Sequence, residues 1–291
     1  MRRFRAWLSI CALFMALTVT PAMAADDDRL RIVFIAYENP NQLMEDVEPV
    51  IDYLREQMKL EIKPFMATDY AGVVEALRNE TADAGFMGPL QYVMAHHYAG
   101  AYPIVGEVYG ESATYFSRIF VRKDSGIESL EDLRGKTVSF VDPISSSGYM
   151  YPLDIFKSGG LIRDKDDAEK FFGRIYFAGG DEQAIRAVYN RFVDAAGIGQ
   201  YAYDLLRPEE REQVIHIAES RPLPSHCVVV RKGLAPARAM ALQKALLALN
   251  DGPRRELLKS LYNVDGYVPV THETYTEVEL VARQYGFIHG K

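Results

Sequence analysis

The chain has 291 residues, of which 48% are hydrophobic and 25% charged, with 33 lysines and arginines against 40 aspartates and glutamates. This composition excludes an intrinsically disordered chain, and the formal charge of −7 gives no electrostatic reason to expect nucleic acid or an anionic membrane as partner. The length predicts a folded protein of roughly two domains. Any anion must therefore be held by a local site.

The first 24 residues have the pattern of a secretory signal peptide. Arg2, Arg3 and Arg5 precede an apolar run over residues 6–19, and the small-x-small sequence of residues 22–24 follows. A retained membrane anchor is the alternative, but the run is shorter than the ~20 residues that cross a bilayer. Cleavage after residue 24 of 291 would leave 267 residues and take the formal charge from −7 to −10. We therefore expect an acidic, exported protein.

Short apolar runs alternate with amphipathic stretches in the first half of the mature chain. We predict strands over 30–36, 62–67 and 82–87, each followed by a helix, over 43–58, 70–78 and 89–97. This alternation is typical of an open parallel sheet flanked by helices.

The second half repeats this pattern, with strands over 137–141, 174–178 and 193–198 followed by helices over 147–157, 181–190 and 200–206. Two further extended runs, 115–122 and 227–231, are predicted to pair within the first domain. The chain would cross out near Gly126 and return near 222–224, and helices over 236–250, 254–262 and 271–285 would pack on the first domain. We therefore predict lobe 1 from residues 25–124 plus 222–291 and lobe 2 from residues 125–221, with a hinge at the two crossings.

The most informative junction is the run of three serines, Ser145, Ser146 and Ser147, which is followed by Gly148 directly after a predicted strand. Ligands of open α/β sheets bind where strands end and helices begin, and helix N-termini favour oxyanions. Three hydroxyls add O–H donors suited to a tetrahedral oxyanion. An ordinary serine N-cap would explain one serine but not three. Ser146 as a nucleophile is a weaker interpretation, because the Gly-x-Ser-x-Gly pattern is missing.

Three other junctions place candidate side chains at the same edge of the predicted sheets. Tyr70 follows Thr68 or Asp69 as a helix cap, and Met87 precedes a Gly-Pro turn. Asp181 follows two glycines, where helix capping alone would explain an acid. If Asp181 faces an oxyanion site, it favours a ligand that carries its own proton or a cationic group.

Metal and cofactor sites are poorly supported, and we expect neither. The adjacent histidines 96 and 97 diverge on a helix, and the pair His226 and Cys227 is too small to form a site. After cleavage Cys227 would be the single cysteine, so no internal disulfide is possible. Tyr37, Tyr115 and Cys227 are further candidates for ligand contact.

Several motifs together resemble one protein family. They are DYAG (69–72), AD-x-G-F-x-G-P (82–89), the run VRKDSGIESLEDLRGKTVSFVDPISSSGY (121–149), VDAAGIG (193–199), PLPSHCVVVRKGL (222–234) and GYVPV (266–270). This set is similar to the phosphate, phosphite and phosphonate-binding components of ABC importers, and the resemblance covers nearly all of the mature chain.

The resemblance implies a type II periplasmic binding protein: an α/β protein with two open mixed sheets flanked by helices and a two-strand hinge. It would be a monomer in the periplasm that closes on a small oxyanion and docks to an ABC permease. The residues 145–147 match the family's Ser-Thr-Ser run that holds phosphoryl oxygens, and Tyr70 matches its DYAG tyrosine.

Departures from the family pattern concern ligand choice. Met87 replaces a tyrosine, Asp181 a histidine, His226 an aspartate and Cys227 a proline. His226 could be the cationic partner and Asp181 the acceptor, which keeps a phosphonate or phosphite as the leading ligand. Two alternatives remain. Cys227 could bind arsenite in a protein that feeds a sensor kinase, or Ser146, His226 and Asp181 could form a hydrolytic triad. We do not expect an enzyme.

Overall fold

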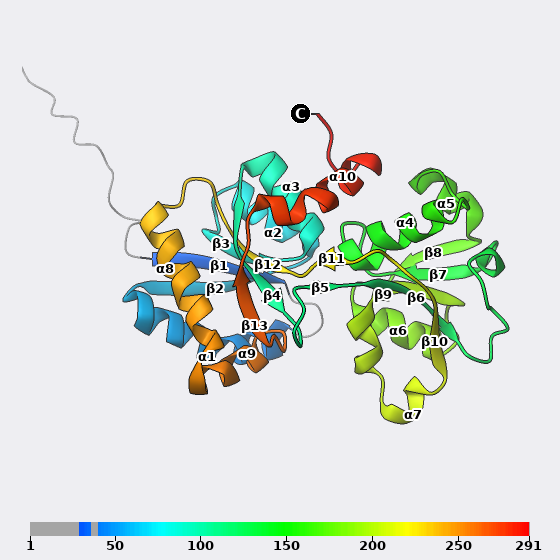
Figure 1. Cartoon of the computed structure of the whole chain (residues 1–291), viewed down its shortest axis with the longest axis horizontal. Helices are drawn as coiled ribbons and strands as arrows, with labels where there is room; N and C mark the ends of the chain where they lie inside the picture. Colours follow the sequence, from blue (N-terminus) through cyan, green and yellow to red (C-terminus); the bar gives the residue numbers. More distant parts are fainter. Residues whose placement is uncertain (1–28, 36–39, 291) are drawn as a thin grey trace, which may run out of the picture.

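The structure is a computed structural model that describes residues 29–35 and 40–290. The predicted signal peptide and Tyr37 lie outside these residues. Two mixed sheets stand side by side and are joined by two extended crossings (Figure 1). Helices flank both sheets, as predicted.

The first sheet has six strands. In spatial order they are β13 (Gly266–Pro269), β4 (Tyr102–Val108), β12 (Cys227–Val230), β3 (Ala84–Met87), β1 (Arg29–Ile35) and β2 (Glu61–Ala67). β1 runs parallel to β2 and β3, whereas β12 is antiparallel to β3 and β4, and β13 is antiparallel to β4. The helices around this sheet are α1 (Pro40–Met58), α2 (Tyr70–Arg78), α3 (Pro89–Ala99), α8 (Pro236–Leu247), α9 (Glu256–Ser260) and α10 (Thr276–Gln284).

Alternation along β1 divides the packing around this sheet into two cores. Ile32 and Phe34 face a cluster that includes Val47 of α1 and Leu242 of α8. Val33 faces the opposite cluster, which is formed with α2, α3 and α10. Because successive side chains of a strand point to opposite faces, a continuous apolar strand requires helices on both sides. This second cluster continues without a break into the core of the other sheet.

The second sheet has five strands and its own helices. The strand order is β10 (Val214–Glu219), β6 (Ser117–Arg122), β9 (Ala195–Gly199), β7 (Thr137–Phe140) and β8 (Arg174–Phe177). The α-helices are α4 (Tyr151–Ser158), α5 (Lys165–Phe171), α6 (Asp181–Tyr189) and α7 (Pro208–Arg211), and a π-helical turn over Ser146–Met150 leads into α4. Short 3₁₀ turns occupy Glu131–Leu133, Gln200–Leu205, Ala248–Asn250, Gly252–Arg255 and His272–Tyr275.

The predicted partner of residues 115–122 is wrong. β6 lies in the five-stranded sheet between β10 and β9, and not beside β12 in the six-stranded sheet. Phe120 of β6 stands opposite Ala196 of the small-residue strand β9. A buried apolar strand fits either sheet by its local pattern, so its sheet is decided by partners far away in the sequence.

The crossings between the sheets form a two-stranded pair. β5 (Thr114–Tyr115) is antiparallel to β11 (Leu223–Pro224). The first crossing therefore lies about residue 115 rather than near Gly126, whereas the second lies within the predicted range 222–224. In Figure 1 these two segments run together between the sheets.

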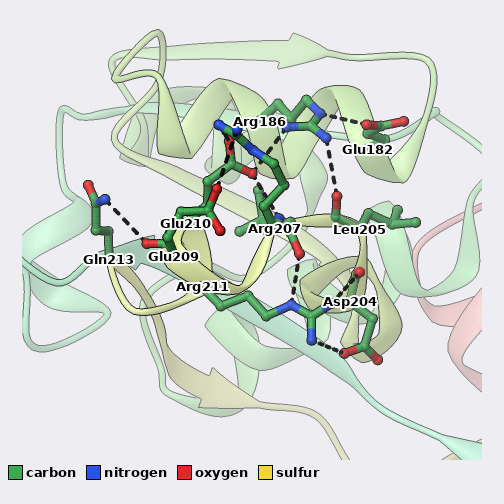
Figure 2. Close-up of polar contacts among 10 residues, drawn as sticks. Glu182, Arg186, Asp204, Leu205, Arg207, Glu209, Glu210, Arg211 and Gln213 are labelled. Carbon is green, nitrogen blue, oxygen red and sulfur yellow. Dashed lines mark hydrogen bonds and ion pairs between the residues drawn. The ribbon is translucent and has the colours of Figure 1, made fainter.

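A cluster of arginines and glutamates orders the segment between β9 and β10 (Figure 2). Arg186 of α6 binds Glu182, Glu210 and the carbonyl of Leu205, and Arg207 binds Glu210 at 2.7 Å. These hydrogen bonds from Arg207 lower the pKa of the Glu210 carboxyl to about 2. The cluster fixes the segment that carries Leu205 and the aromatic residue Tyr201. The segment is a 3₁₀ turn and not the helix predicted over 200–206.

The C-terminal helix α10 bridges the two halves of the molecule. It packs against α3, and Figure 1 shows it beside α3 and reaching toward α4. The Tyr285 hydroxyl, just after α10, donates to Asp154 of α4 at 3.4 Å. Within the described residues, no helix combines the length and apolar character needed to span a bilayer.

Candidate functional site

A cavity of about 460 Å³ lies between the two sheets. Its lining includes all seven residues predicted as ligand contacts: Tyr70, Met87, Ser145, Ser146, Ser147, Asp181 and His226. Of the further candidates, Tyr115 lines the cavity, Cys227 does not, and Tyr37 is outside the described residues. The strand-to-helix junctions of both sheets thus converge on one space, as expected for α/β proteins.

The serine segment owes its shape to local capping. Ser145 is the N-cap of the π-helical turn, and its side-chain oxygen accepts from the Gly148 amide at 3.1 Å. A β-carbon at Gly148 would stand 2.4 Å from the side chain of Val141, so only glycine allows the turn to approach the end of β7 this closely. The turn therefore places three consecutive hydroxyls at a helix start.

Each of the three serine oxygens accepts a hydrogen bond from the protein. Ser145 accepts from the Gly148 amide, Ser146 from the Leu90 amide at 2.8 Å and Ser147 from the Tyr115 hydroxyl at 3.3 Å. A hydroxyl has one hydrogen and two lone pairs, so each serine keeps its O–H as a donor. The Ser146 bond joins the two halves, because Leu90 is in the first turn of α3.

Tyr70 approaches from the first sheet. It is the first residue of α2, whose N-cap is Asp69, and the Asp69 carboxylate accepts from the Gly72 amide at 2.8 Å. Burial, followed by the negative charges of Asp181 and Asp142, raises the pKa of Tyr70 well above its usual value of 10. Tyr70 is therefore a neutral phenol that can donate a hydrogen bond within the cavity.

A buried acid that the sequence analysis missed lies next to His226. Glu107 of β4 is 2% exposed, and its carboxylate accepts from the Tyr109 hydroxyl at 2.8 Å. The His226 Nδ1 atom is 3.8 Å from Glu107 Oε2. Burial raises the pKa of Glu107 to about 7 and lowers that of His226 to about 4. Burial thus favours a neutral imidazole and argues against His226 as the cationic partner, a role that the sequence allowed.

Aromatic rings form one wall of the cavity. Tyr201 lies 5.1 Å from Tyr109 and 6.4 Å from Tyr115, measured between ring centroids, and Tyr115 stacks on His226 at 5.7 Å. Gln91 and Tyr262 also line the space and were not predicted. Of these tyrosines only Tyr115 was a predicted candidate. Tyr109, Tyr201 and Tyr262 had no signal in the sequence beyond their residue type, because they are brought together by contacts between distant parts of the chain.

Cys227 is fully buried in β12 and packs in the core. Burial raises the pKa of its thiol far above the usual range, and Tyr275 is its hydrogen-bond partner. The Cys227 thiol therefore belongs to the hydrophobic core and not to the lining of the cavity. No cluster of three or more metal-ligating side chains occurs in the part of the chain that the structure describes.

Comparison with known proteins places this architecture in a family. A family model described as "ABC transporter, phosphonate, periplasmic substrate-binding protein" matches residues 32–275. The chain belongs to this family. The resemblance seen in the sequence motifs is thereby confirmed, and no finding supports a metalloid sensor or a hydrolase.

Two curated members of this family are similar over much of the chain. The phosphate-import protein PhnD of Mycolicibacterium smegmatis is 31% identical over 184 residues, which are 62% of this chain and 56% of that protein. The phosphonates-binding periplasmic protein of Escherichia coli is 28% identical over 238 residues, or 78% of this chain and 69% of that protein. The match therefore spans little more than half the length of the first relative.

The fold also matches solved structures. PhnD1 from Prochlorococcus marinus, solved in complex with methylphosphonate, aligns with a TM-score of 0.78 at 17% identity, over 90% of this chain and 99% of that chain. The predicted fold class, a two-lobed type II periplasmic binding protein, is confirmed.

Proposed function

We propose that this protein captures a small phosphorus oxyanion, a phosphonate, phosphite or phosphate, in the cavity between its two lobes. The observation that carries the proposal is the set of serine hydroxyls at 145–147, each with its oxygen engaged by the protein and its O–H left to donate. A tetrahedral oxyanion accepts several such bonds at once, and a helix start adds a favourable dipole.

The charges around the cavity favour an oxyanion that is partly protonated or substituted. Glu107, Asp181 and Asp46 line the space, and no arginine does among the described residues. Lys259 lines it too, but its ammonium is paired with Asp265 at 2.5 Å. Because carboxylates repel a fully ionised dianion, we expect phosphite or a phosphonate to bind more tightly than sulfate.

Capture would proceed by hinge closure. Residues up to about 114 and from about 224 form the proposed lobe 1, and the segment between them forms lobe 2, with β5 and β11 as the hinge. The Ser146–Leu90 hydrogen bond joins the two lobes beside the cavity. A ligand that contacts both lobes stabilises the closed form by its differential affinity for that form.

The proposed setting is the periplasm, reached by way of a cleavable signal peptide, with an ABC permease as the partner and a monomer as the working unit. Membership of the substrate-binding family supports this setting. We propose binding without turnover, because the Ser146 oxygen is held as an acceptor and His226 lies against Glu107.

Isothermal titration calorimetry of the mature protein with phosphite, methylphosphonate, phosphate, arsenite and sulfate tests the proposal. We expect one-to-one binding of at least one phosphorus oxyanion, a weaker response to sulfate and no product by phosphorus NMR. Ligand that binds the native state also raises the melting temperature, which gives an independent readout. The proposed function would be refuted if no phosphorus ligand binds detectably, or if arsenite is the one ligand that binds.

A further inference from the structure

Gln91 is a buried polar side chain that has no hydrogen-bond partner within residues 29–35 and 40–290. It lies in the first turn of α3, is 1% exposed and lines the cavity. Neither its Nε2 nor its Oε1 atom has a hydrogen-bond partner among the described residues. Buried amide groups nearly always have partners, and an orphaned one calls for an explanation. The simplest explanation is that a ligand supplies the missing bonds.

Gln91 lines the same cavity as the three serines. Leu90, its neighbour in the chain, donates its amide hydrogen to Ser146. A β-carbon at Gly88 would stand 2.5 Å from Gln91 Oε1 and 3.2 Å from the ring of His226. The absence of a side chain at Gly88 therefore leaves room for Gln91 and His226 over the same patch of backbone.

The cavity has room for more than an oxyanion. Its volume of about 460 Å³ lies within the range of pockets that hold organic ligands, which is roughly 300–1,000 Å³. A free phosphite or phosphate would occupy only the end formed by the serines. A substituent on phosphorus could then extend along the tyrosine wall toward Gln91 and Glu107.

The two orphaned atoms specify the chemistry of that substituent. The Gln91 side chain offers an N–H donor and a carbonyl acceptor. A ligand group that forms hydrogen bonds with both atoms must itself accept one hydrogen bond and donate another. A hydroxyl does both, whereas an ammonium only donates and a carboxylate only accepts. A carboxylate would also face the buried carboxyl of Glu107 and the acid Asp181.

We propose that Gln91 is a specificity-determining residue that binds a hydroxyl group on the organic substituent of the ligand, so that the preferred ligands are hydroxyalkylphosphonates. This inference rests on the proposed function, because it assumes that the serines hold the phosphonate group. It adds a second polar subsite, formed by Gln91 next to His226.

A matched series of phosphonates tests the inference by calorimetry: ethylphosphonate, 2-hydroxyethylphosphonate, 2-aminoethylphosphonate and phosphonoacetate, with methylphosphonate and phosphite as small references. In the unmodified protein we expect 2-hydroxyethylphosphonate to bind at least about tenfold more tightly than ethylphosphonate. In Gln91→Leu this preference should vanish while the affinity for ethylphosphonate is kept. Gln57→Leu, an exposed position in α1, is the matched control and should keep the preference.

Each other outcome has a separate meaning. If ethylphosphonate and 2-hydroxyethylphosphonate bind equally to the unmodified protein, or if the preference survives in both Gln91→Leu and Gln91→Met, the inference is wrong although the proposed function stands. If 2-aminoethylphosphonate binds most tightly and loses that advantage in Glu107→Gln, the acid selects a cation and the inference is again wrong. If no phosphorus ligand in the series binds, the proposed function fails, and this inference fails with it.

Discussion

The side-chain oxygen of Ser146 accepts a hydrogen bond from the backbone amide of Leu90 at 2.8 Å, and both residues are buried. Ser146 belongs to the helix start of the five-stranded sheet, whereas Leu90 is in the first turn of α3 beside the six-stranded sheet. The bond thus joins the N-terminal ends of two helical segments. A single hydroxyl serves both the proposed ligand and the contact between the lobes.

Replacement of Ser146 by alanine should therefore weaken binding in two ways. The ligand loses one O–H donor, and the Leu90 amide loses its acceptor when the lobes close. A hydrogen bond to a charged group contributes roughly 1.5–3 kcal/mol, so we expect affinity for phosphite or methylphosphonate to fall by about 10- to 100-fold. Calorimetry on Ser146→Ala measures this loss. Ser146→Thr keeps the hydroxyl and should retain most of the affinity.

The matched control for this prediction is Ser158→Ala, since Ser158 is an exposed serine at the end of α4. It should leave affinity unchanged. Equal affinities for Ser146→Ala and the unmodified protein would show that the oxyanion is not held at the serine segment.

Local sequence patterns predicted the site residues that lie at strand-to-helix junctions. Ser145 caps its own turn, and Tyr70 follows its own N-cap, so neighbouring residues suffice to place them. Glu107 was missed because Pro103 and Gly106 obscure the strand pattern of β4, which was not predicted. Gln91 was missed because a single polar residue within the predicted helix over 89–97 gives no indication of what it faces. Only the convergence of β3, β4 and β12 shows that both face a cavity.

Arg221 should stabilise the closed arrangement. Its guanidinium lies in the second crossing, binds Asp154 of α4 at 3.1 Å and also pairs with Glu277 of α10. Exposed ion pairs contribute up to about 1 kcal/mol each and weaken with salt. We expect Arg221→Ala to lower ligand affinity by about two- to fivefold, through faster release, and the difference to shrink in 1 M salt.

Stopped-flow release kinetics distinguish this role from a general loss of charge. Arg163→Ala removes an exposed arginine that pairs with Asp167 at the start of α5, away from the crossings. This control should release ligand at the rate of the unmodified protein. If Arg221→Ala and Arg163→Ala release ligand at the same rate, the ion pairs of Arg221 with Asp154 and Glu277 do not hold the lobes together.

Cys227 should behave as a core residue. Its thiol is fully buried and does not line the cavity, and burial raises its pKa. We expect a thiol reagent to label the folded protein only at the rate of unfolding, since the thiolate is the reactive form. Saturating phosphite should slow labelling only as far as it stabilises the fold. Rapid labelling of the native protein, blocked by ligand, would instead place the thiol in the site.

Glu107 should make the stability of the protein depend on pH. Burial raises the pKa of Glu107 from 4.5 to about 7 in the folded protein, so the folded state keeps a proton that the unfolded state releases. The contribution of the neutral carboxyl is complete below pH 4.5 and is lost as the pH rises through about 7. His226, with its pKa lowered to about 4, has the opposite effect, because it costs stability as the pH falls from 6.5 toward 4.

Comparison of the unmodified protein with Glu107→Gln isolates the first effect, since His226 is present in both. The amide cannot ionise, so the variant should gain stability relative to the unmodified protein between pH 4.5 and 7 and keep a constant difference above that range. At about 1.4 kcal/mol per pH unit this interval limits the gain to about 3 kcal/mol. Urea unfolding at pH 4.5, 6, 7 and 8 measures it. Parallel stability curves for the two proteins across this range would mean that Glu107 is already ionised in the folded state, in which case the cavity carries a fixed negative charge next to His226.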